Sequence, residues 1–133
     1  MKNKEYDAGI FLLLSFIHSI IHSFIHSCLV YSAIEEMVAK NPSSVFTYEY
    51  LLSACDDIAD PRILNTIYAH ATTNIQDNAF LFIQYGEFLE EMDEYAGAKA
   101  MFSKAYSITP TDDLARSIVR VGFFQLNDWL ING

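Results

Sequence analysis

Carboxylates are the first side chains in this sequence whose spacing could support chemistry. Asp56, Asp57 and Asp60 lie close together, but they do not follow the ordered ligand spacing of a calcium loop. Carboxylates favour helix starts, so we interpret the cluster as a solvated helix terminus. The sequence also has no nucleophile elbow, glycine-rich phosphate loop or paired metal motif. It therefore predicts no catalytic residue, no enzyme activity and no cofactor.

Three histidines, His18, His22 and His26, recur at four-residue spacing, which places them on one helical face where a divalent metal could bind. Another interpretation explains more of the pattern. Residues 15–27 are the tetrapeptide Phe-Ile-His-Ser repeated, with only Ile20 out of step, and a repeated TTCA tetranucleotide encodes that peptide. We favour this microsatellite origin and predict no metal site. Residues 1–27 then form a low-complexity extension that precedes the folded domain.

The same segment leaves a membrane interpretation open. No charged residue occurs from Ala8 to Ile34, a stretch longer than the roughly 18 apolar residues typical of a membrane-spanning helix. Serine and histidine side chains are costly at membrane depth, and they gather on one arc of the helix while isoleucine and phenylalanine occupy the other. Residues 10–30 are accordingly predicted either to anchor the chain to a membrane or to form an amphipathic helix.

Composition limits the remaining classes of partner. The chain has 8 Lys and Arg against 17 Asp and Glu, and its net charge of −9 argues against a surface that binds nucleic-acid phosphates directly. Cys28 and Cys55 make no disulfide framework or metal pattern, so we expect both to be buried in a protein of a reducing compartment. The sequence thus favours a cytoplasmic or nuclear protein, with membrane association as the alternative.

Segment 79–112 carries a spaced set of small and aromatic residues. On a helix over about 78–91, one apolar stripe recurs every three or four positions: Phe82, Tyr85, Leu89 and Met92. Gly86 lies inside this stripe, although a glycine within a helix costs about 1 kcal/mol relative to alanine. We therefore expect a second helix to pass too closely for a Cβ, with Ala98 at the contact. Thr109-Pro110 should end that second helix.

These positions resemble the tetratricopeptide repeat, a 34-residue helix-turn-helix unit with small residues at fixed places and a closing proline. Counted from Ala79, the matching positions are Gly86, Ala98, Phe102, Ala105 and Pro110. The half-a-tetratricopeptide repeat of RNA-processing scaffolds is similar at Phe82, Tyr85, Phe88, Ala98, Phe102 and Ala105. The pentatricopeptide repeat is similar at Glu36-Met37, Phe46-Thr47-Tyr48 and residues 51–55.

The resemblance implies a domain over 28–133 that is all-α, with antiparallel helix-pair repeats in a short right-handed α-solenoid. Its best repeat is 79–112. A degenerate repeat at 45–78 has Tyr48, Leu51, Leu64, Tyr68 and Ala71 at the motif positions, and a truncated repeat at 113–133 suggests a fragment of a longer repeat protein. The predicted helices are 9–39, 44–57, 61–73, 78–91, 94–107 and 112–125.

The resemblance also implies a function, because this family binds peptides or partner helices in a groove lined by each repeat's first helix. The corresponding residues here are Phe46, Glu49, Ser53, Asp56, Asp57, Phe80, Ile83, Glu87, Glu90 and Glu91. Such a groove is acidic and would favour a basic protein or peptide partner. The resemblance thus implies an interaction scaffold. The alternatives are a membrane-anchored adaptor, a scaffold fragment of an RNA-processing complex, and carboxylates that form only a solvated face.

Overall fold

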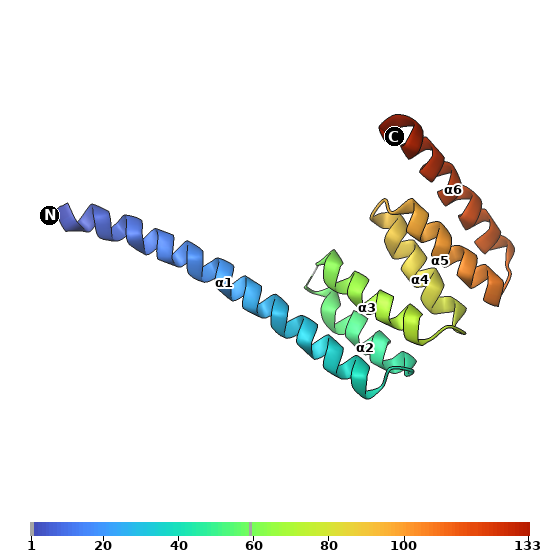
Figure 1. Ribbon diagram of the computed structural model, residues 1–133, viewed down its shortest axis with the longest axis horizontal. Helices are drawn as coiled ribbons and strands as arrows, with labels where there is room; N and C mark the ends of the chain where they lie inside the picture. The colour runs from blue at the N-terminus through green and yellow to red at the C-terminus, as the bar shows by residue number, and fades with distance from the viewer. Residues whose placement is uncertain (1, 59) are drawn as a thin grey trace. The chain divides into compact units, whose positions relative to one another are not determined.

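The computed structural model describes the backbone of residues 2–58 and 60–133, and the side chains of 9–22, 26–58 and 60–133. All regular secondary structure in these residues is α-helical (Figure 1). The helices are α1 (Lys2–Lys40), α2 (Val45–Asp56), α3 (Pro61–Asn74), α4 (Ala79–Glu91), α5 (Tyr95–Ile108) and α6 (Asp112–Asn132). The all-α prediction is confirmed. The largest difference at a C-terminus is in α6, which continues past the predicted end at 125 because no proline or glycine interrupts it before Gly133.

The chain forms two compact units, Met1–Lys40 and Asn41–Gly133. The first contains α1 alone, in which Ile34 and Val38 are buried and every described side chain from Gly9 to His22 is exposed. The predicted boundary at Ser27 falls inside this continuous helix. Phe24 and Ile25 of the tetrapeptide repeat lie outside the described side chains.

The second unit contains two consecutive antiparallel helix pairs, α2 with α3 and α4 with α5, followed by α6 (Figure 1). The pair α4 and α5 packs most extensively. Its buried core combines side chains of α4, α5 and α6: Phe82, Leu89, Ala98, Phe102, Ala105, Leu114 and Val121. Of the predicted apolar stripe, Phe82 and Leu89 are buried, Tyr85 packs against the core from its edge, and Met92 is 42% exposed because it follows the end of α4. Antiparallel helix-pair repeats of the α-solenoid type are therefore confirmed.

Gly86 occupies a close approach between α4 and α5, but its partner is not the predicted one. A Cβ built on Gly86 would lie 2.8 Å from Cε1 and 2.9 Å from Cδ1 of Phe102. The expectation of Ala98 at this contact is wrong, because the ring of Phe102 reaches across to the glycine. Glycine is needed here to accommodate an aromatic ring, which is 1% exposed.

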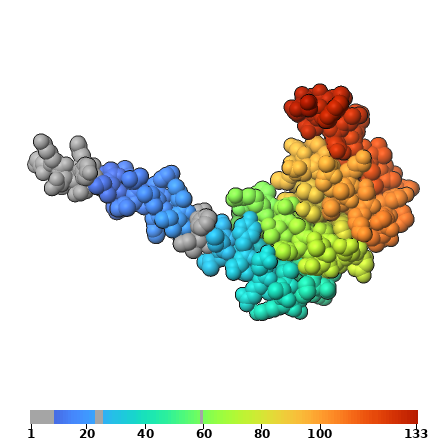
Figure 2. Space-filling model, in the orientation of Figure 1, coloured from blue at the N-terminus to red at the C-terminus, as the bar shows by residue number. Residues whose placement is uncertain are grey.

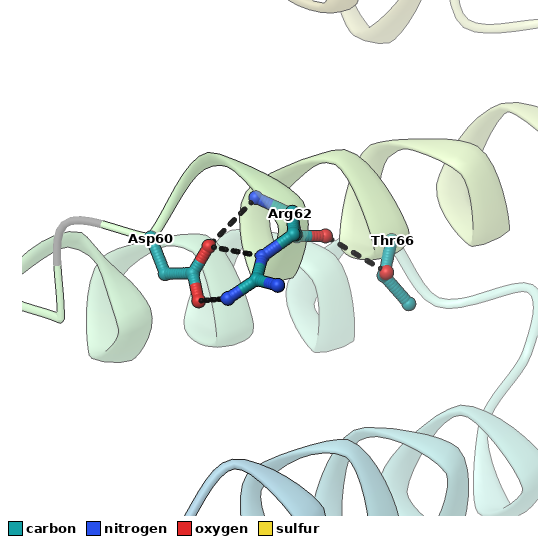
Figure 3. Close-up of polar contacts among 3 residues, drawn as sticks. All are labelled: Asp60, Arg62 and Thr66. Carbon is teal, nitrogen blue, oxygen red and sulfur yellow. Dashed lines mark hydrogen bonds and ion pairs between the residues drawn. The ribbon is translucent and has the colours of Figure 1, made fainter. Parts of the chain in front are cut away.

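The start of α3 agrees with the interpretation of Asp60 as part of a helix terminus. Asp60 is the N-cap, Pro61 is the first helical residue, and the Asp60 side chain accepts a hydrogen bond from the backbone N–H of Arg62 at 3.0 Å. Figure 3 shows the Arg62 guanidinium folding back to donate to both oxygens of the same carboxylate. These contacts lower the pKa of Asp60 and fix the first turn of α3.

The degenerate repeat keeps only part of the predicted core. Tyr48, Leu51 and Ala71 are buried, as their motif positions require. The Tyr48 hydroxyl donates to the carbonyl of Pro42 and accepts from the Asn74 side chain at 2.9 Å, which ties the start of α2 to the end of α3. On α3, however, Ile63 and Ile67 are buried instead of the predicted Leu64 and Tyr68, which are only half-buried.

Candidate binding groove

The second unit contains a recessed surface where α2, α3 and α4 meet. Its volume is about 280 Å³, and three of the eight residues that line it are acidic. From α2 it is lined by Leu52 and Asp56, from α3 by Leu64 and Tyr68, and from α4 by Gln84, Glu87, Phe88 and Glu91. We call this surface the acidic cavity.

The acidic cavity follows from the helical register of α3. One residue along an α-helix is a rotation of about 100°, so burial of Ile63 and Ile67 turns Leu64 and Tyr68 away from the core between α2 and α3. These two side chains face α4 and form one wall of the cavity. The contact between α3 and α4 is the least extensive of the consecutive helix contacts from α2 to α6, which leaves room for the recess.

Aromatic rings pack against one another where α3 meets α4. Tyr68 stacks on Tyr85 with ring centroids 5.3 Å apart and planes inclined by 10°, and it also contacts Phe88 at 5.3 Å. The Tyr85 hydroxyl donates to the side-chain oxygen of Asn65 at 2.8 Å. The sequence pattern placed Tyr85 in the apolar stripe of the best repeat, whereas in the structure its ring and hydroxyl join α4 to α3.

The electrostatics of the cavity are negative. Burial is the largest cause of the raised pKa of Tyr68, and the nearby charges of Glu87, Glu91 and Asp56 raise it further. In the described part of the chain, no cation forms an ion pair with these three carboxylates. The charge of Glu87 is partly offset by Arg120, whose guanidinium interacts with it at longer range. A cation that entered the cavity would therefore face Asp56, Glu91 and the partly offset Glu87 beside two aromatic rings, which is a favourable arrangement for a lysine or arginine side chain.

The structure brings together three of the ten residues predicted for the groove, namely Asp56, Glu87 and Glu91. Ser53 is exposed and does not line the cavity. Phe46 and Phe80 lie on the first turns of α2 and α4 and are 81% and 60% exposed. Glu49 and Asp57 are exposed but do not line the cavity. Ile83 packs against the core of the best repeat.

Glu90 does not face the cavity. Its two carboxylate oxygens each accept a hydrogen bond of 2.8 Å from the guanidinium of Arg120 on α6. Glu90 therefore holds α6 to α4, and its charge is neutralised where the family register predicted a free carboxylate. No local pattern indicates this pairing, because the two residues are 30 positions apart in the chain.

Tyr68, Gln84, Phe88 and the two leucines of the cavity were missing from the predicted groove. The family register assigns ligand contacts to the first helix of each repeat, so it omits Leu64 and Tyr68 of α3. One signal was available, because Ile63 and Ile67 form an apolar stripe one residue ahead of the motif stripe. Two competing stripes on one helix indicate that the second must face another neighbour.

The histidines and cysteines considered in the sequence analysis do not line the acidic cavity. His18 and His22 have their rings stacked 6.3 Å apart on exposed turns of α1. Within the described residues no three histidine, cysteine or acidic side chains are grouped so as to hold a metal ion. Cys55 is buried, and burial raises the pKa of its thiol, but Cys28 is exposed. The expectation that both cysteines are buried was wrong for Cys28, because α1 carries it on an open face.

Comparison with known proteins supports the fold. No family model matches the chain, and no curated protein matches it. Among solved structures, the crystal structure of MamA protein superposes with a TM-score of 0.56 at 22% identity. The match covers 77% of this chain and 58% of MamA, which is itself a helical-repeat protein. At this identity the likeness shows a shared helical-repeat fold.

Proposed function

We propose that this protein is an interaction scaffold that binds a basic peptide segment across α2 and α4, with one lysine or arginine side chain in the acidic cavity. The observation that carries the proposal is the convergence of Asp56, Glu87 and Glu91 around a 280 Å³ recess with aromatic walls. Helical-repeat proteins present such surfaces to peptides and partner helices, and the resemblance to MamA supports that general class.

Exposed aromatic side chains indicate that the ligand is an extended peptide and not a single ion. Phe46 and Phe80 occupy the opposite ends of α2 and α4 from the cavity-lining carboxylates Asp56 and Glu91. A peptide that runs along these helices could contact the rings with apolar side chains while its basic residue enters the cavity. Aromatic anchors contribute much of the free energy in protein interfaces, whereas exposed charges mainly improve encounter rate and selectivity.

The test compares two variants that each remove two negative charges. The cavity variant is Glu87→Gln with Glu91→Gln, and the control is Asp77→Asn with Glu94→Gln, which are exposed and outside the cavity. Peptide arrays would identify basic ligands, and fluorescence anisotropy would then measure Kd for one such peptide at low and moderate salt. We expect the cavity variant to raise Kd about tenfold and to reduce its salt dependence. Equal changes in both variants would leave these carboxylates as an ordinary solvated face.

A second candidate function is a membrane-anchored adaptor. Within the described residues, Gly9–Lys40 of α1 is long and apolar enough to cross a membrane. Its apolar side chains from Ile10 to Ile21 are exposed, as they would be in contact with lipid. Signal sequences and core helices satisfy the same length and composition test. Cell fractionation with carbonate extraction tests this function: retention in the membrane pellet supports an anchor, and release contradicts it.

A third candidate, a scaffold fragment in RNA processing, would act through protein contacts and would use the same acidic cavity. The net charge of −9 makes direct binding to RNA phosphates unfavourable. Capture of the same partners after ribonuclease treatment would agree with this mode, whereas loss of all partners would contradict it.

A further inference from the structure

The outer face of α6 carries a row of exposed apolar side chains. Val119, Phe123, Leu126 and Leu130 are 73%, 69%, 55% and 67% exposed. They are separated by four, three and four residues, which is the spacing of the seam in a coiled coil. We call this row the α6 seam.

The α6 seam lies on the side of the helix that faces away from α5. Leu114 and Val121 are the buried residues of α6, and both belong to the core shared with α4 and α5. At 100° per residue, the mean direction of the seam is about 160° from the mean direction of these two residues. Figures 1 and 2 show α6 at the end of the second unit, with its C-terminal turns extending beyond α5.

We propose that the α6 seam binds the same seam of a second copy of this chain, with the two helices antiparallel. Such a contact is symmetric, because each copy contributes the same patch. Pairing Val119 with Leu130 also pairs Phe123 with Leu126, so all four seam residues find partners in one register. No other segment of the sequence needs to be invoked.

A hollow on the same face supports this register. It has a volume of about 370 Å³ and is lined by four residues of successive turns: Ala115, Arg116, Val119 and Arg120. The hollow is shallow and open. The antiparallel register places Leu130 of the second copy against Val119, at this hollow, so the facing side chain meets a recessed surface and not a raised one.

Charge distribution selects the antiparallel direction. Asp112 and Arg116 lie near the N-terminal end of the seam. The charged side chain near its C-terminal end is Asp128, which at 100° per residue points about 170° away from the seam. A parallel pair would place Arg116 opposite Arg116 and Asp112 opposite Asp112. The antiparallel pair separates these like charges by most of the length of the helix, and like charges that face each other across an interface are unfavourable.

The area of the seam indicates how stable the pair should be. From their exposed fractions, the four side chains offer on the order of 450 Å² per copy, given aromatic side chains of about 150–250 Å². Both copies, with the arginine stems beside them, bury about 1,000 Å², which is near the lower limit for a specific interface. We therefore expect a reversible dimer with a dissociation constant in the micromolar range.

The experiment measures association of the full chain by sedimentation velocity over a range of concentrations. Phe123→Glu should raise the dimer dissociation constant about 30-fold or more, as expected for an interface anchor. Tyr50→Glu is the matched control, because Tyr50 is a similarly exposed aromatic residue on α2 at 63%. Leu13→Glu provides the same control for α1. Both should dimerise as the unaltered chain does, and circular dichroism should show the same helix content in all variants.

A charge swap tests the direction of pairing. In the antiparallel register, position 123 of one copy faces position 126 of the other. Phe123→Glu and Leu126→Lys should each be monomeric alone and should form a one-to-one dimer when mixed. If the two helices were parallel, mixing the variants would not restore the dimer, because position 123 would face position 123 and not position 126. Three results would overturn the proposal. The unaltered chain could stay monomeric at protein concentrations about 100-fold above a micromolar dissociation constant. Tyr50→Glu or Leu13→Glu could abolish association as completely as Phe123→Glu does, or the mixture of Phe123→Glu and Leu126→Lys could fail to form dimers.

Discussion

Gly86→Ala sets two opposing effects of known size against each other. Replacing a glycine within a helix by alanine ordinarily stabilises it by about 1 kcal/mol. The new Cβ would lie 2.8 Å from Cε1 of Phe102, whereas carbon atoms in ordinary contact are about 3.5–4.0 Å apart. The ring must therefore move by about 0.7 Å or more. Phe102 is 1% exposed and belongs to the core cluster formed by α4, α5 and α6, so a shift of its ring displaces other core side chains.

Overpacking of this kind costs about 1–3 kcal/mol, so Gly86→Ala should be neutral to destabilising by about 2 kcal/mol once the helix propensity is included. Gly122→Ala is the control, because its Cβ would meet only the Lys99 side chain at 3.9 Å and should keep the full gain. Urea unfolding of both variants measures the difference. The double variant Gly86→Ala with Phe102→Leu should show a favourable coupling energy, because the smaller side chain leaves space for the new methyl group.

The result that refutes the packing account is an equal rise in the unfolding midpoint for Gly86→Ala and Gly122→Ala. Equal gains would mean that the ring moves without cost. Both glycines lie inside helices, but a Cβ would lie 2.8 Å from the nearest side-chain atom at Gly86 and 3.9 Å from it at Gly122, so the comparison reports on the contact with Phe102.

Three further predictions follow from individual contacts. Asp60→Ala should cost about 1 kcal/mol at neutral pH. Because Arg62 lowers the pKa of Asp60, the difference in free energy of unfolding between the two proteins should be fully present above about pH 4. It should disappear as the pH falls through the pKa of Asp60 in the folded protein, which urea unfolding at a series of acidic pH values would show. Glu87→Gln with Glu91→Gln should lower the raised pKa of Tyr68, as measured by NMR, because two nearby negative charges are removed. In the unaltered chain, the contribution of neutral Tyr68 to the free energy of unfolding is present below about pH 10 and is lost as the pH rises through the folded pKa of Tyr68. Deletion of residues 1–27 should preserve cooperative unfolding of the second unit, and a non-cooperative transition would show that it needs this segment.

The fold could be predicted because its signals are local. Prolines and capping residues fix the helix boundaries, and the positions of Ala98, Phe102 and Ala105 fix which face of α5 is buried. The sequence predicts that another helix passes close to Gly86, but not which side chain makes the contact. A glycine indicates that something passes closely, but which side chain fills the space depends on the rotamer of Phe102 and on the angle between two helices.

The candidate groove could be predicted only in part, because it combines residues from three helices. Asp56, Glu87 and Glu91 were identified through the family register. The pairing of Glu90 with Arg120 depends on the placement of α6, which no local pattern reports. Tyr68 was assigned to the core on the assumption that the degenerate repeat packs as the best repeat does.

The acidic cavity and the degeneracy of the repeat have one cause. In α5 the motif positions are filled by Ala98, Phe102 and Ala105, and all three are buried. The equivalent positions of α3 hold Leu64, Tyr68 and Ala71, of which only the small Ala71 is buried, because Ile63 and Ile67 provide a rival apolar stripe. The resulting rotation reduces packing between α3 and α4 and places a tyrosine beside three carboxylates. A repeat that matched the family motif more closely would bury Tyr68 and leave no aromatic wall for a cation. The departure from the motif therefore marks the α3–α4 junction as the surface to examine for a partner.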